Sequence, residues 1–383
     1  MAKPSYTQDC IQQAAYTSVT LQLKTFHAAT ACSKRCIESL EESSKVQRDK
    51  ETFTNEKKHL LRPTNEFDQS IHSRALEACF IQLKLSSRSI LAYACSIQAH
   101  GYPATAFFRN KADGLQGIGG LLHNFLKDFG PCLIKKYEPK AIVVFSAHWE
   151  SRPGWPISVT DYGKDQPLLY DYYGFPPECY EAKWHSNGSS EISDQVIECL
   201  TKAGIEARKT TTKEPRGQDG RKGPSSGLDH GVFIPFMIMF PEGKNTTFSI
   251  PIVQVSMDGS LDPFENYKLG QSLSLLRKQG ILVLCGGLTV HNLEDFREFS
   301  QHTASESVKT FDDSIIPAAL ENDSYKRLKN LVNLTETPGF RRAHPRADHF
   351  APIWVAAGAG DGEGETRILC DLHGCKTIAF GVL

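Results

Sequence analysis

The sequence predicts an α/β domain with a central, mostly parallel or mixed sheet flanked by helices. From about residue 89 to the end of the chain, short apolar runs alternate with segments of helical periodicity. Such alternation is typical of parallel strands that are joined by helices. The 383 residues are 40% hydrophobic and 23% charged, which is enough apolar content for a sizeable core. We therefore expect one domain over residues 89–383.

The expected strands are short and apolar, as buried parallel strands require. They are residues 89–97, 141–145, 248–257, 281–287 and 376–381. Helical periodicity predicts the intervening helices. These are residues 113–130, 190–203, 264–279, 303–333 and 351–359. Two long polar segments, 211–231 and 336–350, are expected to be functional or mobile loops.

Residues 1–88 differ in composition from the rest of the chain. Within them, residues 38–69 are dense in charge and poor in apolar side chains. This composition predicts either a solvated helix or a disordered segment. No functional motif is evident there, so we treat residues 1–88 as an N-terminal extension that precedes the domain.

Charge and cysteine content argue against several classes of protein. The net charge is −1, whereas nucleic acids and anionic membranes select proteins with a basic surplus. No run of residues is long and apolar enough to span a bilayer. The 11 cysteines are irregularly spaced and no signal peptide precedes them, so we expect reduced thiols and a cytoplasmic protein. Residues 1–36 are poor in acids and rich in Ser/Thr, which faintly resembles a mitochondrial presequence and leaves that location as an alternative.

Five histidines share one setting, because each lies where an apolar run ends or a polar loop begins. They are His100, His148, His230, His291 and His349. In open α/β sheets, ligands bind beyond the carboxyl ends of the parallel strands, and the first, second and fourth of these histidines follow predicted strands. Neutral imidazole is a common ligand of zinc and iron. A single strand-end histidine is more often an ordinary hydrogen-bonded side chain, but the recurrence predicts a metal site.

The other histidines have no such setting. Four are expected to be structural or exposed: His123, His185, His302 and His373. His344 is expected to touch the site only indirectly, and Asp348 is placed to cap the helix predicted at 351–359. The glycine-rich segment 114–120 lacks the lysine and the spacing of a phosphate-binding loop, so it predicts a plain helix start.

Four segments are together similar to the DOPA-dioxygenase-type branch of the class III extradiol ring-opening dioxygenases, the LigB-like family. They are SAHW at 146–149, GLDHG at 227–231, GGLTVHNL at 286–293 and HPRADHFAPIWVAAGA at 344–359. Their order and approximate spacing also match, and the resemblance covers about residues 90–383. It implies an α/β domain with a metal ion at one end of its central sheet.

The resemblance also implies roles for the five histidines. His100, His148 and His349 match the metal histidines of the family, which would hold one Fe(II) or Zn(II) ion per chain. His291 matches the acid/base, which in relatives is also seen as a fourth metal contact. His230 matches a pocket residue that contacts the substrate and assists catalysis, and Trp149 is expected to line the same pocket.

The implied reaction is extradiol cleavage of a catechol-type ring, either DOPA-like or another small aromatic diol, with O2. Two alternatives from other classes remain open: a non-catalytic metal-binding scaffold and a zinc hydrolase. A scaffold has no use for an acid/base such as His291, which argues against the first. No glutamate stands in an HExxH-like position to serve as the base of a hydrolase, which weakens the second.

Overall fold

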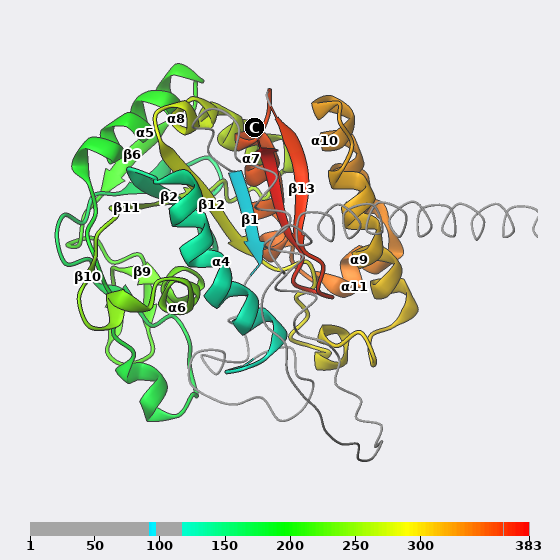
Figure 1. Ribbon diagram of the computed structural model, residues 1–383, viewed down its shortest axis with the longest axis horizontal. Coiled ribbons are helices and arrows are strands. Elements are labelled where there is room, and N and C mark those ends of the chain that lie inside the picture. The colour runs from blue at the N-terminus through cyan, green and yellow to red at the C-terminus, as the bar shows by residue number, and fades with distance from the viewer. Residues whose placement is uncertain (1–91, 97–116, 363, 383) are drawn as a thin grey trace, which may run out of the picture. The chain divides into compact units, whose positions relative to one another are not determined.

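The computed structural model describes residues 92–96, 117–362 and 364–382, which form a mixed α/β structure around an eight-stranded sheet (Figure 1). The N-terminal extension, its predicted boundary at residues 88 and 89, and His100 lie outside the described residues. Across the sheet the strands are β13 (Glu365–Cys370), β14 (Thr377–Val382), β1 (Ala92–Ser96), β12 (Ile281–Gly287), β2 (Ala141–Glu150), β11 (Ile252–Met257), β3 (Ile157–Thr160) and β6 (Ala207–Thr210).

The central strands β1, β12, β2 and β11 run parallel to one another. The pairs β1–β14, β13–β14 and β11–β3 are antiparallel, and β6 is parallel to β3. The sheet is therefore mixed with a parallel centre, which confirms the predicted fold class.

Helices cover both faces of this sheet. They are α4 (Leu121–Tyr137), α5 (Ser190–Lys202), α6 (His230–Met239), α7 (Pro263–Ser272), α8 (Ser274–Lys278), α9 (Glu306–Ala319), α10 (Ser324–Asn333), α11 (Pro338–Ala343) and α12 (Pro352–Ala359). Short 3₁₀ turns are η1 (Pro177–Glu181), η2 (Pro241–Lys244), η3 (Phe296–Phe299), η4 (Leu334–Glu336) and η5 (Ala347–His349). Among the described residues, none of the helices has the length and apolar content needed to cross a membrane.

Six further strands lie outside the main sheet, in three small two-stranded pairs. They are β4 (Leu168–Leu169) with β9 (Leu228–Asp229), β5 (His185–Ser186) with β10 (Thr247–Phe248), and β7 (Gly217–Asp219) with β8 (Gly223–Ser225). The last pair shows that the polar segment 211–231 is partly ordered into a hairpin rather than being a continuous loop.

The core is divided into two layers because side chains alternate along each central strand. In β2, Val143 and Phe145 point into a core built with α5, α7, α9, α11 and α12. Ile142 and Val144 point into the opposite core, which is built with α4 and α6. Both faces of β2 are therefore buried, and this explains why its sequence is apolar without alternation.

Several predicted elements differ in their bounds. The helix predicted at 264–279 is two helices separated at Leu273, and the one predicted at 303–333 is α9 and α10. Residues 113–116 of the first predicted helix lie outside the described residues, and α4 starts at Leu121, after Gly117 and Gly119, whose φ of 84° is a left-handed conformation that interrupts a regular helix. Segment 336–350 contains α11 and η5, and β13 was not predicted.

Candidate metal centre

The carboxyl ends of β2 and β12 lie side by side and define the edge of the sheet that carries the site. Ser146 of β2 pairs with Gly286 of β12. His148 follows Ser146 within β2, and His291 lies four residues beyond Gly287, the end of β12. Parallel strands thus deliver two separate histidine-bearing segments to one edge, as ligand sites in α/β sheets require.

The pairing of β2 becomes irregular where the strand carries His148. Phe145 pairs with Val255 and Glu150 pairs with Met257, so four residues of β2 lie opposite one residue of β11. Irregular pairings of this kind re-aim side chains and are common beside active sites. The SAHW segment occupies this irregularity.

Two glycines allow other segments to approach the strand ends closely. A Cβ on Gly231 would lie 2.4 Å from Ser146 Oγ, so the glycine of GLDHG lets α6 begin against β2. A Cβ on Gly287 would lie 2.3 Å from the carbonyl oxygen of His349, which itself accepts a hydrogen bond from Leu288 N at 2.8 Å. Glycine at these positions brings His230 and His349 to the site.

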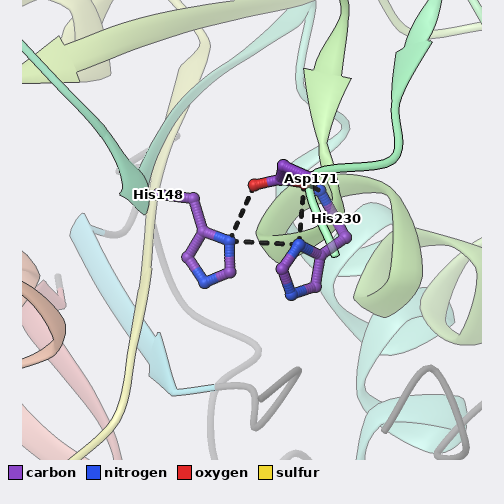
Figure 2. Close-up of side chains that lie close together, drawn as sticks. All are labelled: His148, Asp171 and His230. Carbon is purple, nitrogen blue, oxygen red and sulfur yellow. Dashed lines mark hydrogen bonds and ion pairs between the residues drawn. The ribbon is translucent and has the colours of Figure 1, made fainter. Parts of the chain in front are cut away.

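One carboxylate holds two of the histidines (Figure 2). Asp171 Oδ2 lies 3.0 Å from His148 Nδ1, and Asp171 Oδ1 lies 2.7 Å from His230 Nδ1. Asp171 Oδ1 also accepts a hydrogen bond from His230 N at 2.9 Å. The two Nδ1 atoms are 3.1 Å apart. Because a carboxylate only accepts, each ring best serves it as an Nδ1–H donor, which leaves both Nε2 atoms with a lone pair.

A second group lies on the segment that enters α12. His349 Nδ1 lies 3.3 Å from Asp348 Oδ1, which also accepts a hydrogen bond from His349 N at 3.0 Å. The rings of His349 and His291 are stacked, with centroids 3.6 Å apart and planes at 9°. Ligand atoms of His291, Asp348 and His349 all lie within 4.8 Å of one another, as do those of the Asp171 group.

The two groups meet at a pair of nitrogen atoms. His148 Nε2 and His349 Nε2 are 3.2 Å apart. Two nitrogen ligands bound to one zinc or iron ion at about 2.0–2.1 Å would be about 3 Å from each other. Both rings face a carboxylate through Nδ1, the usual arrangement that orients a metal-binding imidazole. This donor set fits a metal ion.

The electrostatics of the site favour neutral rings for His291 and His349. Burial lowers the pKa of His349 well below its usual range, and the nearby His291 and His148 lower it further. Burial also lowers the pKa of His291 to about 3, although the Asp348 carboxylate opposes this. For His148, burial would lower the pKa, but the hydrogen bond and charge of Asp171 outweigh it and raise the pKa.

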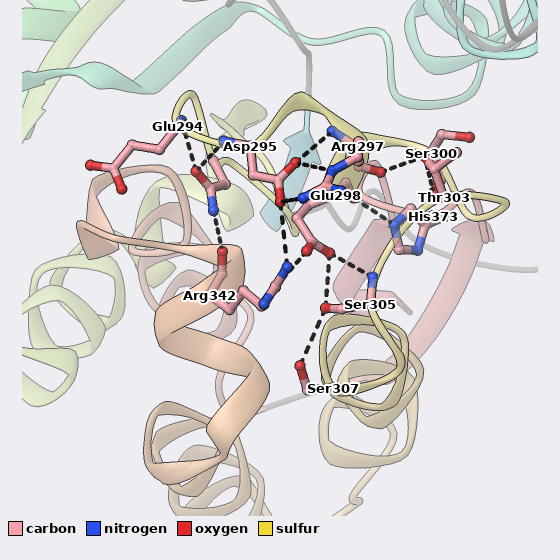
Figure 3. A network of polar contacts seen from close by, with 11 residues as sticks. Glu294, Asp295, Arg297, Glu298, Ser300, Thr303, Ser305, Ser307, Arg342 and His373 are labelled. Carbon is pink, nitrogen blue, oxygen red and sulfur yellow. Dashed lines mark hydrogen bonds and ion pairs between the residues drawn. The ribbon is translucent and has the colours of Figure 1, made fainter.

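The loop after His291 is tied to α11 by a polar network (Figure 3). Asn292 Nδ2 donates to the carbonyl oxygen of Arg342 at 2.7 Å. Arg342 Nε donates to Glu298 Oε1 at 2.5 Å, and its Nη2 lies 3.3 Å from Asp295 Oδ2. Ser305 N donates to Glu298 Oε2 at 2.8 Å. Glu298 thus links the loop after His291 to α11, through Arg342, and to the residue before α9, Ser305.

A buried ion pair supports the start of α6. Asp229, fully buried, pairs with Arg216 and accepts hydrogen bonds from Ser146 Oγ at 2.7 Å and Gln254 Nε2 at 2.5 Å. The Arg216 guanidinium lies 4.3 Å from the centre of the Trp149 ring. Trp149 therefore packs against segment 211–231, and its contact with a substrate stays a prediction.

The structure brings together four of the five histidines singled out in the sequence, while His100 lies outside the described residues. Sequence reasoning missed Asp171 altogether. The prediction that Asp348 caps the following helix is wrong: α12 begins at Pro352 without a side-chain cap, and Asp348 faces His349 instead. The sequence did hold a signal for this contact, because Asp348 directly precedes His349, a predicted metal ligand, and such ligands commonly pair with a carboxylate.

The other histidines that the structure describes occupy different elements of the fold. His185 and His302 are exposed, and His123 is half-buried on α4. His344 is fully buried, packs against the rings of Phe340 and Phe350, and has its Nε2 3.0 Å from the carbonyl oxygen of Thr289.

A sheet with a parallel centre and a cluster of histidines and carboxylates at its edge defines a class of α/β proteins with a candidate metal site. Residues 117–379 match the family model described as the catalytic LigB subunit of aromatic ring-opening dioxygenase. The chain therefore belongs to the LigB family and is a class III extradiol dioxygenase-type protein.

Similar proteins agree with this family. The chain is 43% identical, over 74% of its length and 90% of the relative, to a 4,5-DOPA dioxygenase extradiol-like protein of Schizosaccharomyces pombe. It is 30% identical, over 74% of its length and 92% of the relative, to a 4,5-DOPA dioxygenase extradiol of Beta vulgaris. A crystal structure of an uncharacterized protein from Escherichia coli K12 shares the fold, with a TM-score of 0.50 and 23% identity over 68% of this chain and 93% of that one.

Replacing Asp171 with Asn should weaken metal binding by about 10–100-fold. The amide can still accept at its oxygen, but its nitrogen donates, so one of the two rings must accept at Nδ1 and protonate Nε2 instead. Metal affinity measured by competition with a chelator checks this. Asp194→Asn, at an exposed carboxylate that pairs with Lys209, is the control; equal affinity for both variants would contradict the tautomer argument.

The apoprotein should lose stability as the pH falls from about 6.5 to about 4. Burial lowers the pKa of His344 to about 4. Between pH 6.5 and pH 4 the unfolded chain therefore binds a proton at His344 that the folded chain does not bind. Each pH unit in this interval lowers the free energy of unfolding by up to about 1.4 kcal/mol per histidine. Urea unfolding of the apoprotein near pH 7 and near pH 5 should show a smaller loss for His344→Gln than for the unmodified protein. An equal loss would show that His344 is protonated alike in both states.

Proposed function

We propose that the chain is a metal-dependent extradiol dioxygenase that opens the ring of a catechol-type substrate with O2. The observation that carries the proposal is the 3.2 Å approach of His148 Nε2 and His349 Nε2, with the His291 ring stacked on His349. The two relatives, which are 43% and 30% identical, are named a 4,5-DOPA dioxygenase extradiol-like protein and a 4,5-DOPA dioxygenase extradiol. DOPA and simple catechols are therefore the substrates to test first.

His148 and His349 would hold the ion, together with His100. The position of β1 supports the third ligand: Ser96, the last residue of β1, pairs with Gly287 at the edge that carries the site. His100 follows Ser96 by four residues. When bound, Fe(II) supplies the redox chemistry with O2 that zinc lacks, so we propose iron for the active form.

His291 is proposed to be the acid/base. Its ring lies against His349, and burial keeps it neutral near pH 7 because its pKa is lowered to about 3. A neutral imidazole can accept the proton of a substrate hydroxyl and later return it. It cannot do so efficiently as a permanent ligand, so we assign it a role separate from that of His148 and His349.

His230 is proposed to hydrogen-bond a substrate hydroxyl. Its Nδ1 is held by Asp171 at 2.7 Å, which fixes the ring and directs Nε2 away from the carboxylate. The ring of Tyr172 lies edge-on to it, with centroids 5.2 Å apart. Trp149 is proposed to contribute to the wall of the same pocket.

The reaction is tested with apoprotein that is loaded anaerobically with Fe(II) and then mixed with O2 and either DOPA or catechol. We expect O2 uptake together with a yellow ring-opened product. The same protein loaded with Zn(II) should consume no O2, because zinc has no redox chemistry. If iron-loaded protein consumes no O2 with either diol, the proposal fails, and the scaffold and zinc-hydrolase alternatives take its place.

His291→Ala should lower turnover by about 10²–10⁴-fold while the protein keeps its iron. The reason is that the variant removes a proton acceptor without removing a proposed ligand. Iron content by elemental analysis and O2 uptake are measured on the same samples. His302→Ala, at an exposed histidine, should change neither; loss of iron from His291→Ala would instead make His291 a ligand.

A further inference from the structure

A buried ionic cluster lies beside the site and takes no part in the proposed chemistry. Its centre is Asp312 of α9, whose side chain is 1% exposed. Lys376 Nζ lies 3.1 Å and His373 Nδ1 lies 3.4 Å from Asp312 Oδ2. Lys376 also donates to Asp371 at 2.5 Å. A carboxylate is costly to bury, so its presence on a helix face that otherwise packs apolar side chains calls for a reason.

The other oxygen of Asp312 contacts the segment that carries His291. Thr289 Oγ1 donates to Asp312 Oδ1 at 2.8 Å. The amide of Gly374 lies 3.4 Å from the same oxygen, and the Gly374 carbonyl accepts a hydrogen bond from Thr289 N at 3.0 Å. Asp312 therefore fixes the side chain of Thr289 and also the turn to which the backbone of Thr289 is bonded.

The two networks on either side of His291 are joined through one residue. His373 Nδ1 faces Asp312, and its Nε2 lies 2.9 Å from the carbonyl oxygen of Glu298, in the network of Figure 3. His291 N donates to the carbonyl oxygen of Ala343 at 2.8 Å. The backbone of His291 is thus held by α11, and the residue two positions before it is held by α9.

We propose that Asp312 is a positioning residue for His291 and that it acts through the hydroxyl of Thr289. A hydrogen bond from a hydroxyl to a carboxylate is charge-assisted and stronger than a neutral one. Lys376 and His373 orient the carboxylate, which in turn limits how far Thr289 can move. This inference rests on the proposed role of His291 as the acid/base, since the rate of proton transfer depends on close placement of the accepting group.

The test compares substitutions that keep or remove one hydroxyl. Thr289→Val keeps the shape of the side chain and removes the bond, whereas Thr289→Ser keeps the hydroxyl. Thr335→Val is the matched control, because its hydroxyl donates to the carbonyl oxygen of Val332 at 2.8 Å, away from the site. With iron-loaded protein and catechol, we expect Thr289→Val to lower kcat by about 10–100-fold, with KM and iron content unchanged. Thr289→Ser and Thr335→Val should keep kcat within about twofold.

A second measurement does not depend on activity. In apoprotein labelled with ¹⁵N-histidine, the side-chain resonances of His291 are identified by their absence from His291→Ala. We expect them to shift or broaden in Thr289→Val and to stay in place in Thr289→Ser and Thr335→Val. If Thr289→Val does not fold, Asp312→Asn replaces it, because a neutral amide weakens the same bond and should move the same resonances.

Two results would overturn the proposal: a kcat for Thr289→Val equal to that of Thr335→Val, or His291 resonances that do not move. A purely structural role would lower the stability of Thr289→Val without changing kcat or these resonances. If the unmodified protein consumes no O2, the proposed function fails, and the resonances of His291 alone then decide whether Asp312 positions it.

Discussion

The site depends on keeping closely packed imidazole rings from carrying charge together. His148 Nε2 and His349 Nε2 are 3.2 Å apart, and His291 is stacked on His349 at 3.6 Å. Two unit charges at such a distance repel by about 5 kcal/mol even at an effective dielectric constant of 20. Burial lowers the pKa values of His291 and His349 and keeps both rings neutral, so a charge on His148, whose pKa Asp171 raises, would not meet a second charge on either of them. The same condition, neutral rings with fixed tautomers, is the one a metal ion requires of its ligands.

The position of the histidines could be predicted from the sequence because parallel strands share a carboxyl edge. The apolar runs that end near His148 and His291 are β2 and β12, and they are adjacent in the sheet. The residues that hold the rings could not be predicted in this way. Asp171 lies between short irregular segments without periodicity, and only the folding of that chain against α6 brings it to His148 and His230.

The local sequence pattern also led to wrong predictions where one residue suited two roles. Asp348 precedes an apolar helical run, which suits a helix cap, but α12 begins only at Pro352. The carboxylate is therefore free to face His349, and it also lies 3.2 Å from Arg346 Nη1. Likewise, the helix predicted at 264–279 has the right periodicity, yet it breaks at Leu273. Periodicity gives the buried face of a segment more reliably than its ends.

The two halves of the site belong to different layers of the core, so an ion bound between them would have a structural role as well as a chemical one. His230 begins α6, which packs in the layer with α4, whereas Phe350, next to His349, packs in the layer with α9 and α11. An ion shared by His148 and His349 would link β2 to the second layer. His291, by contrast, is anchored within that layer through Thr289 and Asp312. The proposed acid/base would therefore be held by the fold itself, so its position would not depend on metal binding.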